Sequence, residues 1–84
     1  MPNVNKEELL KRITVDPKIM VGKPIIRGMR ISVEQILSAL AGGVSEKDLL
    51  EDYPVLEADD IKAVLLYANE LVKEQKVYVI QPDN

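Results

Sequence analysis

Residues 32–43 read Ser-Val-Glu-Gln-Ile-Leu-Ser-Ala-Leu-Ala-Gly-Gly, and this stretch predicts a helix with both of its ends marked. Ser32, followed three residues later by Gln35, matches a capping box, in which the two side chains bind backbone N–H groups of the first turn. One apolar face follows at helical spacing, made of Val33, Ile36, Leu37, Leu40 and Ala41. Gly42 and Gly43 accept the left-handed conformation that ends many helices.

Two more helices are expected downstream. Ser45 is the predicted N-cap of a short helix that runs to about Tyr53, where Pro54 stops it. The longest helix is expected from about Ala58 to Gln75. Its predicted core face consists of apolar residues at helical spacing: Ile61, Val64, Leu65, Ala68, Leu71 and Val72.

The predicted order of elements is a helix, a glycine turn, a short helix, a second turn and a longer helix. This order is typical of a three-helix helix-turn-helix domain. We therefore expect a mainly α fold with a homeodomain-like or winged-helix-like core over residues 32–75. A basic β and turn arm, residues 1–31, precedes this core, and a strand with a tail, residues 76–84, follows it. The chain is short enough for residues 1–84 to be a single domain.

The N-terminal arm consists of short elements separated by turns. One or two helical turns are expected from Asn5 to Lys11, and a short strand from Arg12 to Val15. Asp16-Pro17 and Gly22-Lys23-Pro24 predict turns, and Ile25-Ile26 is expected to be extended.

The composition argues against an enzyme. The chain contains no histidine and no cysteine, so the commonest general base, the commonest metal ligand and the thiolate nucleophile are all missing. Asp59 and Asp60 are adjacent, which is typical of helix N-terminal acids rather than of a catalytic carboxylate pair. We expect no cofactor, no metal and no membrane-spanning segment, and a cytoplasmic location.

Charge is distributed unevenly. Residues 1–33 carry seven Lys or Arg and three Asp or Glu, whereas residues 34–84 carry four and eleven. This asymmetry suggests an anionic partner at one end of the chain or a cationic partner at the other. The alternative is that the two halves attract each other within a dimer.

The cations of the arm are the candidates for nucleic-acid binding. These are Lys23, Arg27 and Arg30, and they lie among turn residues that let backbone approach a phosphate: Gly22, Pro24 and Gly28. The alternative is that Arg27 and Arg30 pair with internal acids such as Asp16 or Glu34 and fix the arm to its own domain.

The third helix is a weaker candidate for reading bases. A reading helix usually enters the major groove with its N-terminal turn. Here that turn carries Glu57, Asp59 and Asp60, which oppose attraction to a polyanion.

A second candidate surface is a partner or dimer surface. Ala63, Leu66 and Tyr67 are predicted to lie opposite the core face of the third helix, where they would form a small exposed apolar patch. Val77 and Val79, in the predicted terminal strand, could pair with a strand of another chain. The alternative is a few isolated surface apolar residues, which are common.

Several stretches resemble the domain-of-unknown-function 433 family over about residues 12–70. The resemblance rests on Thr14-Val-Asp-Pro-Lys-Ile, Gly22-Lys-Pro-Ile-Ile-Arg-Gly-Met-Arg-Ile-Ser-Val33, Ala41-Gly-Gly-Val-Ser45, Glu51-Asp-Tyr-Pro54 and Ile61-Lys-Ala-Val-Leu-Leu-Tyr-Ala68. It implies a small helix-turn-helix protein, of a kind often interpreted as the antitoxin of a type II toxin–antitoxin module whose partner is a PIN-like ribonuclease. It also implies that six arm residues are signature positions: Gly22, Lys23, Pro24, Arg27, Gly28 and Arg30.

These observations lead to two hypotheses. In the first, the chain is an antitoxin that covers a PIN-like ribonuclease toxin and, as a homodimer, binds its own double-stranded operator DNA. In the second, it is a protein-interaction or structural homodimer that binds no nucleic acid.

Overall fold

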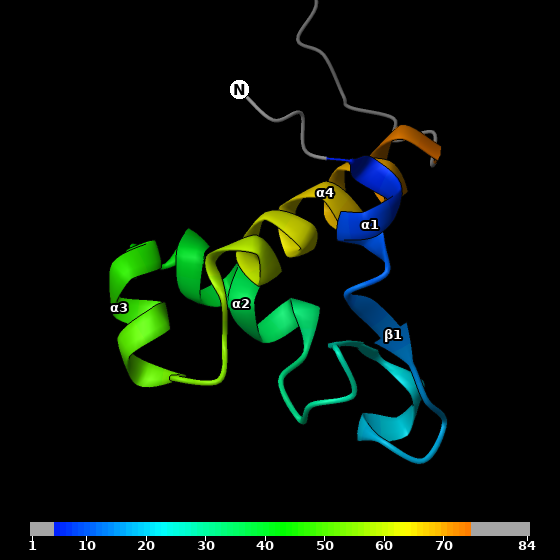
Figure 1. The fold of residues 1–84 in the computed structure, drawn as a ribbon, viewed down its shortest axis with the longest axis horizontal. Helices are drawn as coiled ribbons and strands as arrows, with labels where there is room; N and C mark the ends of the chain where they lie inside the picture. Colours follow the sequence, from blue (N-terminus) through cyan, green and yellow to red (C-terminus); the bar gives the residue numbers. More distant parts are fainter. Residues whose placement is uncertain (1–4, 75–84) are drawn as a thin grey trace, which may run out of the picture.

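The computed structural model describes residues 5–74 and is mainly helical (Figure 1). Its elements follow one another along the chain as α1 (Lys6–Leu10), β1 (Ile13–Val15), the short 3-10 turn η1 (Met20–Gly22), β2 (Pro24–Ile26), α2 (Val33–Ala41), α3 (Glu46–Asp52) and α4 (Ala58–Glu74). No helix within residues 5–74 is long and apolar enough to cross a membrane. The predicted terminal strand, with Val77 and Val79, lies outside the described residues.

The predicted bounds and N-caps of α2 and α3 and the predicted start of α4 are confirmed, whereas the predicted end of the third helix at Gln75 lies outside the described residues. Ser32 Oγ accepts from the Gln35 N–H at 3.0 Å, and Gln35 Oε1 accepts from the Ser32 N–H at 2.8 Å, which completes the capping box of α2. Ser45 caps α3 by accepting from the Asp48 N–H at 3.1 Å. These local contacts satisfy donors that the first turn of a helix leaves unpaired.

The arm folds into a small antiparallel sheet. β1 pairs with β2 in the register Ile13↔Ile26, Thr14↔Ile25 and Val15↔Pro24. On the other edge of β2, Ile25 forms an isolated bridge with Ser32, the residue that caps α2. The arm is therefore joined directly to the start of the helical core.

A tight turn connects β2 to this bridge. The Met29 N–H donates to the Ile26 carbonyl at 2.8 Å, and the two central residues have positive φ, 46° at Arg27 and 72° at Gly28. Such a turn matches the right-handed twist of paired strands, and glycine adopts it without strain. Arg27 is not a glycine, yet its backbone has a positive φ, so tertiary contacts must hold it in this conformation.

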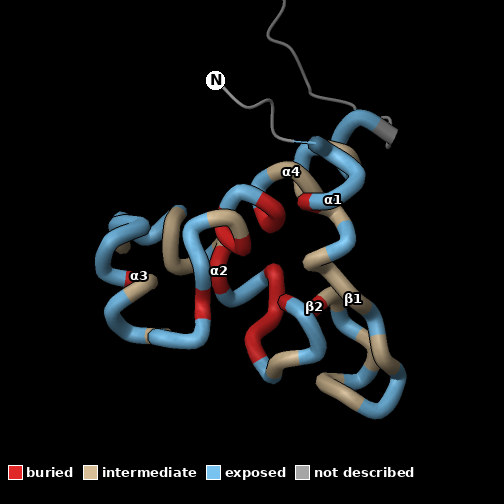
Figure 2. The backbone as a smooth tube through the Cα atoms, in the orientation of Figure 1, coloured by how far each residue is buried: buried red, intermediate tan, exposed pale blue. Residues whose placement is uncertain are grey.

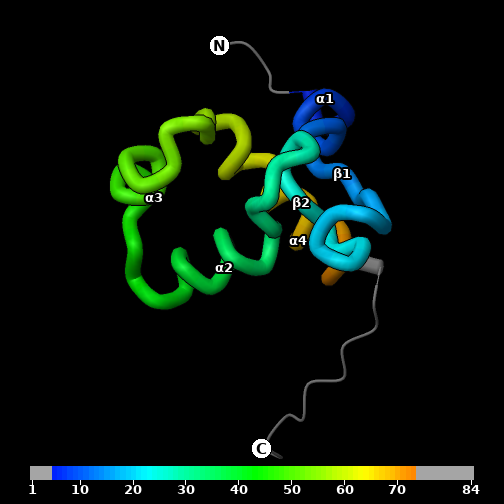
Figure 3. Tube along the Cα trace, turned by 90° about the horizontal axis from the view of Figure 1, so that it is seen from below, coloured from blue at the N-terminus to red at the C-terminus, as the bar shows by residue number. Residues whose placement is uncertain are grey.

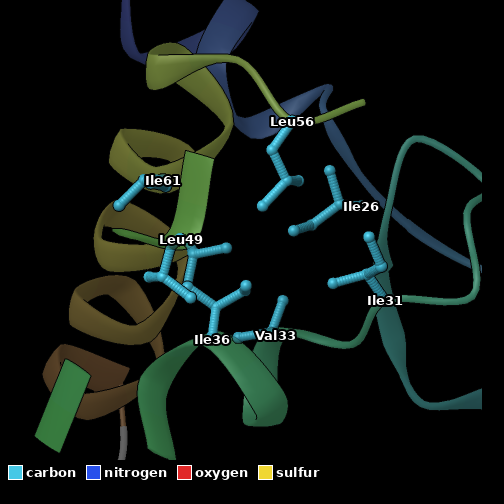
Figure 4. Packing of buried hydrophobic residues seen from close by; sticks show 8 residues of the cluster. Ile26, Ile31, Val33, Ile36, Leu49, Leu56 and Ile61 are labelled. Atoms are coloured by element: carbon cyan, nitrogen blue, oxygen red, sulfur yellow. The ribbon is translucent and has the colours of Figure 1, made fainter. Parts of the chain in front are cut away.

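The hydrophobic core lies where β2, α2, α3 and the first half of α4 meet. Figure 4 shows the cluster, which comprises Ile26, Ile31, Val33, Ile36, Leu49, Leu56, Ile61 and Val64. In Figure 2 the buried segments gather at this centre. Figures 1 and 3 both place α3 on one side of the molecule and the β1–η1 arm on the other.

The predicted faces of the third helix need correction. Ala63, predicted to be exposed, is 0% exposed. Tyr67, one turn further along the helix, is half-buried. α1 packs against α4, and the periodicity of one helix could not foresee this contact because about fifty residues separate the two helices.

The opposite error concerns the predicted core face. Ile61 and Val64 are buried as predicted, but Leu65, Leu71 and Val72 are 50%, 42% and 61% exposed. The apolar stripe of α4 therefore continues along the helix beyond the part that the rest of the domain covers.

Candidate functional site

A buried carboxylate in the first turn of α4 joins the arm to the helical core. The Asp60 side chain is 0% exposed and receives hydrogen bonds on both oxygens. Oδ1 accepts from Arg27 Nε at 2.9 Å and from Arg12 Nη1 at 3.0 Å. Oδ2 accepts from Arg27 Nη2 at 2.8 Å and from the Glu57 N–H at 2.8 Å. We call Asp60, Arg12 and Arg27 the Asp60 clamp.

The turn after β2 places Arg27 in this clamp. Its backbone N–H donates to the Arg12 carbonyl at 2.7 Å, which ties the turn to the chain leading into β1. Its guanidinium binds both oxygens of Asp60, and Nη2 also donates to the Val55 carbonyl at 2.9 Å. A planar guanidinium supplies this two-point contact, which a lysine ammonium cannot reproduce.

Arg12, which lies between α1 and β1, binds the acids at the start of α4. Its Nη1 donates to Glu57 Oε1 at 2.7 Å as well as to Asp60, and its Nη2 lies 3.9 Å from Asp59 Oδ2. The three acids that were expected to oppose a polyanion are therefore compensated by arginines of the arm.

Hydrogen bonds decide the ionisation of Asp60. Burial alone raises the pKa of a carboxyl group, but the donors from Arg27, the Glu57 N–H and Arg12 outweigh it and lower the pKa of Asp60 below its ordinary value of 3.8. The hydrogen bonds that Arg12 donates to Glu57 and Asp60 raise its pKa, and those that Arg27 donates to Asp60 raise the pKa of Arg27. All three groups are charged at neutral pH, and their mutual contacts leave the Asp60 carboxylate no exposed oxygen for a ligand.

Comparison with known proteins places this chain in a family. The family model described as "Protein of unknown function (DUF433)" matches residues 13–68, which include Arg27 and Asp60. The chain belongs to the DUF433 family. The expected resemblance is thereby confirmed.

Two similar proteins extend this result. A solved DUF433 member from Anabaena variabilis superposes with a TM-score of 0.71 at 29% identity, covering 81% of this chain and 67% of that one. The uncharacterized protein y4eO of Sinorhizobium fredii is 33% identical over 73 residues. That alignment covers 84% of this chain, which spans only about a third (33%) of the relative.

Two of the three predicted nucleic-acid residues of this DUF433 chain have carboxylate partners within the domain. Arg27 is held by Asp60, a partner that the internal pairing alternative did not name. Lys23 Nζ pairs with Glu34 Oε1 at 3.0 Å, and both side chains are exposed. Arg30 is exposed and makes no ion pair among residues 5–74.

The glycines and proline of the signature shape the arm. Gly22 and Gly28 have φ of 76° and 72°, a backbone region that side chains strain. Pro24 begins β2 and pairs with Val15, a position at a strand start that tolerates a missing N–H. The signature therefore includes residues that set the path of the arm as well as charged residues.

A second charged surface was not singled out from the sequence. α3 exposes four acids, Glu46, Asp48, Glu51 and Asp52, beside a single lysine, Lys47. None of these five side chains takes part in an ion pair within the described part of the chain. The sequence signal for this surface was the acid content of the second half of the chain.

Two apolar hollows lie on either side of Leu71. A hollow of about 280 Å³ separates it from α1 and is lined by Leu10, Tyr67, Glu70 and Leu71. A second hollow of about 270 Å³ lies toward α2 and β2, lined by Lys23, Pro24, Val33, Glu34, Leu37, Ser38, Tyr67 and Leu71. Residues 5–74 contain no group of three or more His, Cys, Asp or Glu side chains that could hold a metal ion.

Proposed function

We propose that the protein is the antitoxin of a type II toxin–antitoxin module, which binds a PIN-like ribonuclease and, as a dimer, its own operator DNA. The observation that carries the proposal is the difference between the two charged regions. The acids of α3 are exposed and unpaired within residues 5–74, whereas Arg27 is committed to an internal carboxylate. α3 thus offers a partner an anionic surface whose acids have no ion pair within the described residues.

An acidic surface suits a ribonuclease as partner. RNA is a polyanion, so a protein that binds it presents cations to the phosphates. An acidic helix can compete for the same cations, and complementary charge accelerates association and excludes wrong partners. α3 supplies this surface on the side of the molecule opposite the β1–η1 arm (Figure 3).

Operator binding is assigned to the exposed cations of the arm, because the acids of α3 and of the first turn of α4 oppose attraction to a polyanion. Four exposed arm cations make no ion pair within residues 5–74: Lys6, Lys11, Lys18 and Arg30. Lys23 is exposed in a surface pair with Glu34. Surface pairs are weak, so Lys23 can exchange Glu34 for a phosphate at little cost. So few cations give weak, salt-sensitive binding, and a dimer doubles their number.

Toxin binding is tested by reversing the charge of α3. Co-expressed with the product of the neighbouring gene, the wild-type chain is expected to copurify, and the Glu51→Lys/Asp52→Lys variant to bind about tenfold or more weakly at low salt. The control is Glu7→Lys/Glu8→Lys, which makes the same charge change on exposed acids of α1. Separate elution of the wild-type proteins in size exclusion refutes the toxin role, and equal loss in both variants refutes the assignment to α3.

One observation favours the second candidate, a homodimer that binds no nucleic acid. Two of the three predicted phosphate contacts, Lys23 and Arg27, already have carboxylate partners. Fluorescence anisotropy with the DNA upstream of the gene separates the candidates. An operator-binding protein should show affinity that falls with salt and is reduced in Arg30→Ala; equal behaviour of wild type and Arg30→Ala favours the homodimer.

A further inference from the structure

The turn between β1 and β2 has a strained backbone at its tip. Three consecutive residues have left-handed φ, which is 50° at Met20, 57° at Val21 and 76° at Gly22. Glycine adopts this region freely, but a β-branched residue such as valine does so only at a cost. The Val21 side chain is 93% exposed, so little packing within residues 5–74 offsets this cost. Backbone strain of this kind clusters at sites that bind other molecules.

Hydrogen bonds fix the turn in this shape. Asp16 holds its start, because the Asp16 side chain accepts from the Lys18 N–H at 2.9 Å and the Asp16 carbonyl accepts from the Ile19 N–H at 2.9 Å. The Lys23 N–H donates to the Met20 carbonyl at 3.1 Å and closes the turn. A segment that is already held in one shape loses little conformational entropy on binding. The turn is therefore suited to enter the surface of a partner as a rigid body.

The side chains of the turn combine an apolar tip with cations. Lys18 and Lys23 bracket the sequence Ile19-Met-Val-Gly22, in which no side chain makes a strong hydrogen bond. Lys18 makes no ion pair within the described residues, and the Lys23–Glu34 pair is exposed. The major groove of DNA is read mainly through hydrogen bonds to base edges. Proteins that enter the minor groove bring cations to the phosphates and frequently insert an apolar wedge.

The turn lies far from the acids that repel DNA. Figures 1 and 3 show η1 at the end of the arm, on the side of the molecule opposite to α3. The exposed acids of α3 are therefore remote from a polyanion that contacts the tip. Asp16 is the one acid between β1 and β2, and its carboxylate accepts from the backbone of Lys18.

We propose that the η1 turn enters the minor groove of operator DNA, with Val21 as the apolar contact to the base edges and Lys18 and Lys23 on the flanking phosphates. This inference deepens the operator binding of the proposed function and rests on it. The lysines supply attraction that falls with salt, whereas burial of Val21 adds a contact that does not depend on charge. Because guanine places an amino group in the minor groove, the apolar contact favours A·T pairs there.

Two exposed valines provide a matched pair of full-length variants. Val55 is 61% exposed in the connection between α3 and α4, so Val55→Ala makes the same change away from the arm. Fluorescence anisotropy with a duplex of the DNA upstream of the gene should show affinity about tenfold lower in Val21→Ala and unchanged in Val55→Ala. Val21→Gly should lose at least as much affinity without a lower melting temperature, because glycine fits the left-handed backbone. Distamycin, a minor-groove ligand, should displace the wild-type protein, whereas the major-groove ligand methyl green should not.

Wild-type affinity in Val21→Ala or Val21→Gly, or displacement by methyl green alone, overturns the inference and leaves operator binding standing. A wild-type chain that does not bind the duplex at low salt refutes operator binding and the inference with it. If Val21→Ala binds DNA normally but no longer copurifies with the product of the neighbouring gene, the turn contacts the toxin and the inference is wrong. Val21-dependent, distamycin-sensitive binding by a chain that elutes apart from that product supports the inference and refutes the toxin role.

Discussion

The first and second halves of α4 differ in what their side chains contact. The first half buries Ile61 and Val64 in the core and closes a polar network around Asp60, so its contacts are satisfied within one chain. The second half exposes Leu71 and Val72. One helix can thus stabilise its own domain at one end and offer a surface to another molecule at the other.

Removing the carboxylate of the clamp should produce the largest effect. Asp60→Ala leaves Arg12 and Arg27 without their shared acceptor, and we expect a loss of about 3–5 kcal/mol in the free energy of unfolding. Urea unfolding followed by circular dichroism measures it. The control is Asp59→Ala, whose side chain is 50% exposed and 3.9 Å from Arg12, with an expected loss below about 1 kcal/mol. Equal losses of unfolding free energy in both variants would show that the buried Asp60 carboxylate stabilises the domain no more than the exposed Asp59 carboxylate does.

Two apolar residues one turn apart on α4 compare a buried with an exposed position. Ile61→Ala removes a side chain that is 1% exposed, and we expect a loss of about 2–5 kcal/mol because a cavity remains. Leu65→Ala should cost less than about 1 kcal/mol at dilutions where the monomer dominates, because Leu65 is half exposed there. Similar losses from the two substitutions would contradict the contrast between the covered and the exposed apolar residues of α4.

Acid should weaken the clamp in a defined direction. The pKa of Asp60 is lower in the folded state than its ordinary value of 3.8. The ionised carboxylate therefore contributes stability that is fully present above pH 3.8 and is lost as the pH falls through the folded-state pKa. Each unit of lowering corresponds to about 1.4 kcal/mol. In thermal unfolding between neutral and strongly acidic pH, the advantage of wild type over Asp60→Asn should shrink below pH 3.8. A constant difference down to the most acidic buffer would argue against this linkage.

The smallest effect is expected at the other ion pair of the arm. Lys23 and Glu34 have side chains that are 55% and 71% exposed, so Lys23→Ala should change the free energy of unfolding by less than about 0.5 kcal/mol. Double-mutant cycles of Lys23 with Glu34 and of Arg27 with Asp60 compare the two pairs directly by urea unfolding. A coupling as large for Lys23 as for Arg27 would show that the arm is held at two points rather than one.

The helical elements could be predicted because their signals are local. Contacts that span only a few residues mark the helix ends. The marking residues are Ser32 with Gln35, Gly42 with Gly43, and Ser45. The site was harder to predict. Arg27 was identified as important, but its partner Asp60 lies 33 residues away, and neither residue type nor spacing distinguishes it from Asp16 or Glu34.

The sequence by itself determined where the helices begin and end, the apolar stripe of α4 from Ile61 to Val72, and the family, because these depend on residue order and short-range geometry. Only the tertiary structure decided that Asp60 holds Arg12 and Arg27, that Ala63 is covered, and that Val72 is not. The physical reason is that burial and pairing depend on which distant elements arrive beside a residue, and the periodicity of one helix carries no information about that.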